Sequence, residues 1–237
     1  MIKKAFAIAA KEWGTYFKSP MAYIILIISI SVFNVFFFMI IDQNREASLR
    51  DMFKLMEFIF VFTIPLLTMK VFAEEKRQGT FEFLLTSPIS NTTIVLGKYL
   101  GTLLFFTSLI FATFIYYIII EYFGQPDRWA VLAGYFGIWL EGALFIAVGI
   151  LISSWTANQI IAAIISYAVL LTLYLSAVFV KYADPVTAEI IRNISFWSRT
   201  EYFSSGLVQS SDLIYYVTSI GFCLFLTRLS IENRLWK

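Results

Sequence analysis

The sequence contains no histidine and a single cysteine, Cys223, among its 237 residues. Histidine is the commonest general base and the commonest metal ligand, so its absence argues against an intramembrane serine protease or an H-E-x-x-H metalloprotease. One cysteine cannot form a disulfide framework. Charged residues make up only 14% of the chain, against about 25% in ordinary soluble domains. The net charge of +2 is too small to indicate nucleic-acid binding.

What the chain has instead is apolar residues, at 59% of the total, gathered into long runs. A membrane-spanning helix needs about 20 mostly apolar residues. Six runs qualify, and each is too long to be a strand. The sequence therefore predicts an all-α integral membrane protein in one transmembrane domain, residues 1–237, with six helices at about 21–41, 55–72, 99–120, 131–155, 160–180 and 213–229.

The positive residues favour one orientation of these helices. With the N-terminus cytoplasmic, that side carries 11 of the 18 Lys and Arg residues and the other side carries 7. Cytoplasmic loops are enriched in these residues, and an even number of spans returns the chain to its starting side. The sequence therefore predicts a multi-pass protein with both termini in the cytoplasm.

The N-terminal segment 3–18 precedes the first span and combines lysines with apolar residues at helical spacing. Phe6, Ala9, Trp13 and Phe17 repeat with the period of one helix face. This pattern is typical of an amphipathic helix on the membrane surface. A plain basic flank of the first span is the alternative. No apolar stretch precedes the alanines near the start, so we expect no cleaved signal peptide.

The cytoplasmic segment 73–98 between the second and third spans has the most distinctive pattern. A charge cluster leads to Gly79, Thr80 and Glu82, and the pattern ends at Pro88. Gly79 allows a turn and Thr80 can cap a short helix. Ser90 or Asn91 could cap the helix that runs into the third span. The segment is either a short docking helix or a connecting loop that keeps its charges in water.

Residues 73–88 resemble the cytoplasmic loop of ABC-2-type transporter permeases, with an acidic-basic cluster before Gly-Thr and a Leu-Leu-x-x-Pro stretch. Further motifs are similar to the branch of gliding-motility and nitrous-oxide-reductase-maturation permeases, namely residues 17–23, 97–98, 149–159 and 206–216. One departure is Tyr202-Phe203, where that branch has His-Phe. The resemblance covers nearly the whole chain.

The resemblance implies a non-catalytic permease subunit in the bacterial inner membrane, which forms half of the translocation pathway of an exporter. It implies pairing with a second permease, as a homodimer or heterodimer, and with a separate ABC-type ATPase that binds ATP and Mg²⁺. The chain itself has no phosphate-binding G-x-x-x-x-G-K-[ST] loop and is expected to bind no cofactor. Segment 3–18 would be the connecting helix. The ATPase-coupling residues would be Glu74, Glu75, Lys76, Arg77, Gly79, Thr80 and Glu82.

Acidic residues inside the spans are a second candidate feature. Glu141 lies near the middle of the fourth span, where an isolated carboxylate is costly. It either lines a translocation pathway or is a buried, hydrogen-bonded or protonated carboxyl. Nearby Gly134, Gly137 and Gly142 would allow close helix approach. An ATP-independent carrier that uses Glu141 is the alternative function. Glu57 is expected to snorkel to the membrane interface.

Two further features lie outside these sites. Lys70, near the end of the second span, is also expected at the interface, and Pro65 could kink that span. The outer segment 181–212 contains Asp184-Pro185, a turn signal, before an expected short helix over 186–194. The resemblance supports a re-entrant role for this short helix.

Overall fold

The computed structural model describes residues 2–44, 48–85, 89–180 and 182–232. Within these ranges the chain folds into helices without a strand, which confirms the all-α prediction. In chain order the helices are α1 (Ile2–Lys18), α2 (Pro20–Asn44), α3 (Arg50–Thr68), α4 (Lys70–Arg77), α5 (Phe81–Leu85), α6 (Asn91–Phe123), α7 (Arg128–Ser153), α8 (Gln159–Phe179), α9 (Pro185–Ile194), α10 (Phe196–Ser204) and α11 (Ser210–Glu232).

Six segments in the described part of the chain are long and apolar enough to cross a membrane: α2, α3 with α4, α6, α7, α8 and α11. They coincide with the six predicted spans, although several extend beyond them. The 33-residue α6 is about 50 Å long at 1.5 Å per residue, against about 30 Å of hydrocarbon. The helix is therefore longer than the apolar layer is thick, and Lys98 lies in its N-terminal part.

Local side-chain caps explain where several helices begin. Ser90 accepts a hydrogen bond from the backbone N–H of Thr93 at the start of α6, so the predicted cap is confirmed. Asp127 and Asn158 cap α7 and α8 in the same way. Asp184 caps α9. Each cap satisfies backbone donors that the first turn of a helix leaves unpaired.

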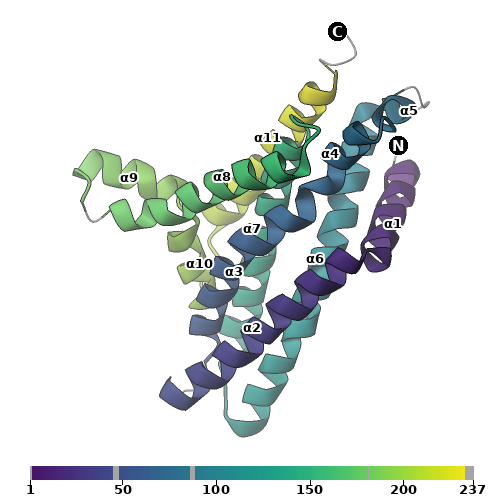
Figure 1. Ribbon diagram of the computed structural model, residues 1–237. Helices are drawn as coiled ribbons and strands as arrows, with labels where there is room; N and C mark the ends of the chain where they lie inside the picture. The colour runs from purple at the N-terminus through teal and green to yellow at the C-terminus, as the bar shows by residue number, and fades with distance from the viewer. Residues whose placement is uncertain (1, 45–47, 86–88, 181, 233–237) are drawn as a thin grey trace.

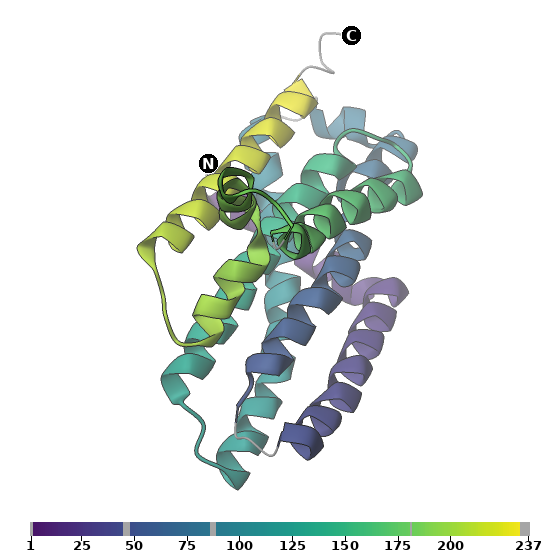
Figure 2. The same ribbon diagram turned by 90° about the vertical axis from the view of Figure 1, so that its left-hand side faces the viewer.

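The ends of the bundle differ in what they carry (Figure 1). The start of α1, the helices α4 and α5 and the end of α11 lie at the upper end, while the turn between α6 and α7 lies at the lower end. Figure 2 shows the same division, with α8 inclined to the other spans in both views. The two described chain ends therefore lie at the same end of the bundle, as an even number of spans requires.

Helix α7 forms the centre of the core. In its most apolar window 83% of the residues are buried, against 22% for α2, 28% for α8 and 17% for α11. Three glycines of α7 allow close packing, because an added Cβ would lie 2.1 Å from Phe53 at Gly134, 2.6 Å from Phe203 at Gly137 and 2.2 Å from Phe106 at Gly142. The expected close approach is confirmed, and much of α2, α8 and α11 faces outward.

Two expectations need correction, and a third segment holds one helix more than expected. Glu57 does not snorkel: it is 1% exposed, because the face of α3 that carries it packs on α7. The second span is longer than expected, because helical structure resumes after a break at Met69 and α4 continues to Arg77, past the predicted end at 72. The segment after α8 holds the expected short helix α9 and also α10, which packs on α7 and α3.

Helix α1 confirms the predicted N-terminal helix but shares its surface between two environments. Ala5, Ala9 and Tyr16 are buried where α1 packs along α6. Phe6 and Trp13 are 60% and 42% exposed. One face of α1 is thus held by the bundle, and the other leaves large apolar side chains for a membrane surface.

Candidate functional site

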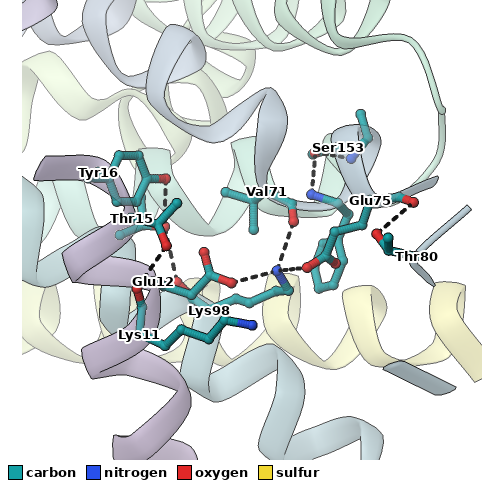
Figure 3. A network of polar contacts seen from close by, with 12 residues as sticks. Lys11, Glu12, Thr15, Tyr16, Val71, Glu75, Thr80, Lys98 and Ser153 are labelled. Carbon is teal, nitrogen blue, oxygen red and sulfur yellow. Dashed lines mark hydrogen bonds and ion pairs between the residues drawn. The ribbon is translucent and has the colours of Figure 1, made fainter. Parts of the chain in front are cut away.

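A buried lysine joins three helices at the upper end of the bundle (Figure 3). The Lys98 ammonium on α6 donates to Glu12 of α1 at 2.8 Å, to Glu75 of α4 at 2.7 Å and to the carbonyl oxygen of Val71 at 3.1 Å. Its side chain is 2% exposed, while those of Glu12 and Glu75 are 19% and 27% exposed. We call Glu12, Val71, Glu75 and Lys98 the Lys98 junction.

Small residues bring α1 close enough to form this junction. An added Cβ at Gly97 would lie 2.6 Å from the Ile8 Cβ, and one at Gly101 would lie 2.5 Å from the Glu12 Cβ. These contacts are shorter than real Cβ contacts, so larger residues would force α1 away from α6. The two glycines flank Lys98 and thereby position Glu12 for its ion pair.

The charges of the junction are satisfied but not fully removed from water. A buried ammonium is stable only when it is paired and hydrogen-bonded, and Lys98 has three oxygen partners. A cavity of about 270 Å³ lies between α1 and α4 and is bordered by Glu12 and Glu75. The carboxylates therefore keep contact with solvent, which lowers the cost of desolvating them.

A second contact between α1 and the spans surrounds Tyr16. Its hydroxyl donates to the Leu67 carbonyl at 3.0 Å and lies 3.1 Å from the Thr102 hydroxyl. Its ring stacks on Phe105 at 4.8 Å, and the Lys70 ammonium lies 4.8 Å above it. Burial raises the pKa of the Tyr16 hydroxyl, so it acts as a neutral hydrogen-bonding group that fixes α1 to α3 and α6.

Ser153 of α7 completes the break between α3 and α4. Its hydroxyl accepts from the backbone N–H groups of Phe72 and Ala73, each at 3.1 Å, and donates to the Met69 carbonyl at 2.9 Å. A helix that changes direction leaves such groups without their usual partners. One buried hydroxyl thus satisfies three backbone groups and ties the start of α4 to α7.

The other end of α4 is also connected to α7. The Lys76 ammonium donates to the carbonyl oxygen of Ser154 and lies 5.2 Å from the Phe81 ring of α5. Ser154 in turn donates to the Ser230 hydroxyl of α11 at 3.0 Å. Helix α4 therefore contacts α6 through Glu75 and Lys98, and Lys98 in turn binds Glu12 of α1. Lys76 binds Ser154 at the end of α7, and Ser154 binds Ser230 of α11. A displacement of α4 would reach four other helices.

The chain is similar to a known family of membrane proteins. Residues 6–192 match the model of a family described as ABC-2 family transporter protein. The chain belongs to this family. A comparison with curated proteins finds no match. The protein is accordingly a multi-pass membrane permease of the ABC transporter class, and its six apolar helices agree with that assignment.

The predicted coupling residues of the permease fall into two groups, one facing the bundle and one facing away from it. Glu75 and Lys76 point into the bundle and make the contacts described above. Glu74 accepts from Gln78 at 3.2 Å. The exposed residues are Arg77, Gly79, Thr80 and Glu82. Gly79 adopts a φ of 70°, a turn conformation that glycine permits, and the Thr80 hydroxyl donates to the Glu75 carbonyl at 3.3 Å.

The sequence patterns of the permease did not predict that Glu12, Tyr16, Lys98 and Ser153 belong to this site. Lys98 was recognised only as a positive residue and within the Gly97-Lys98 motif. A usable signal was present, since Gly97 and Gly101 form a small-x-x-x-small pattern that favours close helix packing. The side chains of Leu84 and Leu85, and the whole of Pro88, lie outside the described part of the structure.

Glu141, the predicted pathway residue of the permease, lies in a different place from the coupling residues. It is 1% exposed and accepts from the Thr200 hydroxyl of α10 at 3.2 Å. Its other neighbour is Glu57 of α3. The structure therefore brings together two carboxyl groups that the sequence separates by more than a whole span, and keeps both apart from the Lys98 junction.

Proposed function

We propose that this permease is the membrane subunit of an ATP-driven transporter and that α4 and α5 couple it to a separate ABC-type ATPase. The observation that carries the proposal is the Glu75–Lys98 ion pair, which connects α4 to α6 and α1. Helix α5 follows α4 at the upper end of the bundle (Figure 1) and exposes Glu82 and Phe83. An ATPase that contacts α5 would thus act directly on α4.

The contacts of α4 suggest how such a movement would be transmitted. Glu75 and Lys76 fix α4 to α6 and α7, and α4 is short, at 8 residues, so it moves as a unit. The interruption at Met69 separates it from α3 and provides a hinge. Movement of α5 would rotate α4 about this point and displace α1, α6 and α7 together.

The proposal includes a second permease, as a homodimer or a heterodimer, because large apolar surfaces of α2, α8 and α11 face outward. ATP and Mg²⁺ would be bound by the ATPase. Both termini would be cytoplasmic, in a bacterial inner membrane, and the direction of transport would be export. The narrower resemblance to gliding-motility and nitrous-oxide-reductase-maturation permeases is a further part of the proposal.

Affinity purification from native membranes tests this function. A tagged chain should recover an ATP-binding-cassette ATPase, and the purified complex should hydrolyse ATP. Recovery of no such ATPase, together with transport that is insensitive to ATP, would support the ATP-independent carrier instead. The variant Glu121→Gln serves as a control and should leave recovery of the ATPase unchanged. Glu121 pairs with the exposed Arg128, near the turn between α6 and α7 at the opposite end of the bundle.

A further inference from the structure

Two carboxyl groups meet in the core of the bundle, away from the Lys98 junction. Glu57 on α3 and Glu141 on α7 are each 1% exposed, their two helices pack on one another, and the two carboxyl groups are neighbours. Glu141 Oε2 accepts from the Thr200 hydroxyl at 3.2 Å. Glu57 Oε1 and Glu141 Oε1 have no hydrogen-bond partner among the described residues. Three helices, α3, α7 and α10, therefore converge on one pair of acids.

The titratable groups that face this pair supply no positive charge. Tyr174 of α8 interacts with both carboxyls, as does Tyr216 of α11, and Tyr215 interacts with Glu141. All three carry phenol groups. Within the described part of the chain, the interactions that reach Glu57 and Glu141 come from each other and from neutral hydroxyl groups.

The remaining elements around the pair contribute apolar contacts or charges that are already paired. Arg199 of α10 forms an ion pair with Asp212 of α11. From α2 and α6, the rings of Phe33 and Phe106 pack on Phe60 of α3. A compensating cation for two ionised carboxylates is thus not provided by the helices described around them.

Two ionised carboxylates in contact inside an apolar bundle would repel each other, and both would lose their hydration. One proton removes a charge and converts the repulsion into a hydrogen bond, as in carboxylate pairs that share a proton. A proton also needs no cavity, which suits groups that are 1% exposed. We propose that Glu57 and Glu141 form an intramembrane proton-binding site, with the proton held between their carboxyl groups.

The site lies where α10 docks on α7, so its occupancy bears on that contact. Thr200 of α10 donates to Glu141, and Phe203, three residues further on, packs against Gly137 of α7. Release of the proton to water leaves two carboxylates that require hydration. Because both groups are buried, water reaches them only if the packing around them opens, and the α10–α7 contact is part of that packing. Proton release is therefore linked to loosening of α10.

Infrared spectroscopy of the purified full chain in lipid nanodiscs tests the site. The wild-type spectrum minus that of Glu57→Gln/Glu141→Gln should contain the carbonyl band of a protonated carboxyl at neutral pH, shifted in D2O. Glutamine preserves shape and hydrogen bonding without a titratable proton. Glu121→Gln is the control, because its carboxylate is paired with the exposed Arg128 and should contribute only carboxylate bands.

A difference spectrum with carboxylate bands alone would overturn the proposal. If the double variant does not fold, the single variants Glu57→Gln and Glu141→Gln replace it. Each changes the hydrogen-bond partner of the remaining acid, so the protonated-carboxyl band should shift or disappear in both. A band unchanged in both single variants would also overturn the proposal. These outcomes do not depend on an ATPase, so a failure of this proposal would leave the proposed function untouched.

Discussion

Replacing Lys98 with methionine removes the positive charge from the Lys98 junction while keeping a long, apolar side chain. Glu12 and Glu75, previously 2.8 and 2.7 Å from the ammonium, would then face each other without a cation. Breaking a fully buried charge pair costs about 3–5 kcal/mol. Because both carboxylates are partly exposed and can turn toward the neighbouring cavity, we expect a loss near the lower end, about 3 kcal/mol.

A double-mutant cycle separates the ion pair from other effects of the substitution. Lys98→Met, Glu75→Gln and the double variant are unfolded in mixed micelles, and the free energies of unfolding are compared. A hydrogen bond to a charged group contributes about 1.5–3 kcal/mol, so the coupling energy should fall in this range. The same cycle on the exposed Arg128–Glu121 pair should give a smaller coupling energy, because solvent screens exposed charges.

Additivity at the Lys98 junction would refute this reasoning. Independent sites add to within about 0.3–0.5 kcal/mol. A coupling energy no larger than that would mean that Glu75 and Lys98 do not stabilise each other. The connection between α4 and α6 would then have to rest on other contacts.

Three further predictions concern packing, the helix break and a cap. Gly101→Ala should destabilise the protein by about 1–3 kcal/mol and expose α1 to trypsin, because its Cβ would lie 2.5 Å from Glu12, whereas Gly14→Ala, with no atom within 4 Å, should not. Ser153→Ala should cost at least about 2 kcal/mol in unfolding free energy, because buried backbone groups lose their partner. Hydrogen bonds from Thr187 lower the pKa of the Asp184 carboxyl, so its contribution to α9 should be present above the unfolded pKa of about 3.9 and lost as pH falls through the folded pKa. Amide exchange in α9 should show this acid loss in wild type and not in Asp184→Asn.

Features that depend on neighbouring residues were predictable from the sequence. Hydropathy located the six spans because lipid requires a continuous apolar run of fixed length. Ser90 was recognised as a cap because a cap bonds to backbone only three residues away. The helix after Asp184-Pro185 was predictable for the same reason. The overall class and these boundaries thus follow from local chemistry.

Features that depend on the packing of distant helices were not predictable. The Lys98–Glu12 contact joins residues 86 positions apart and exists only because α1 lies along α6. Hydropathy gives the depth of Glu57 but not the direction it faces, so the expected interfacial position was wrong. Helix α10 was missed because it is short and combines polar residues with apolar ones, and its position is set by α7.

The central claim, that α5 meets an ATPase, can be tested most directly by site-specific photo-crosslinking in native membranes. Phe83 of α5 is 78% exposed, and Phe123, at the opposite end of α6, is 81% exposed. A photoreactive benzoylphenylalanine at position 83 should crosslink to an ATP-binding-cassette subunit, and the same group at position 123 should not. Equal crosslinking from both positions, or none from position 83, would contradict the account.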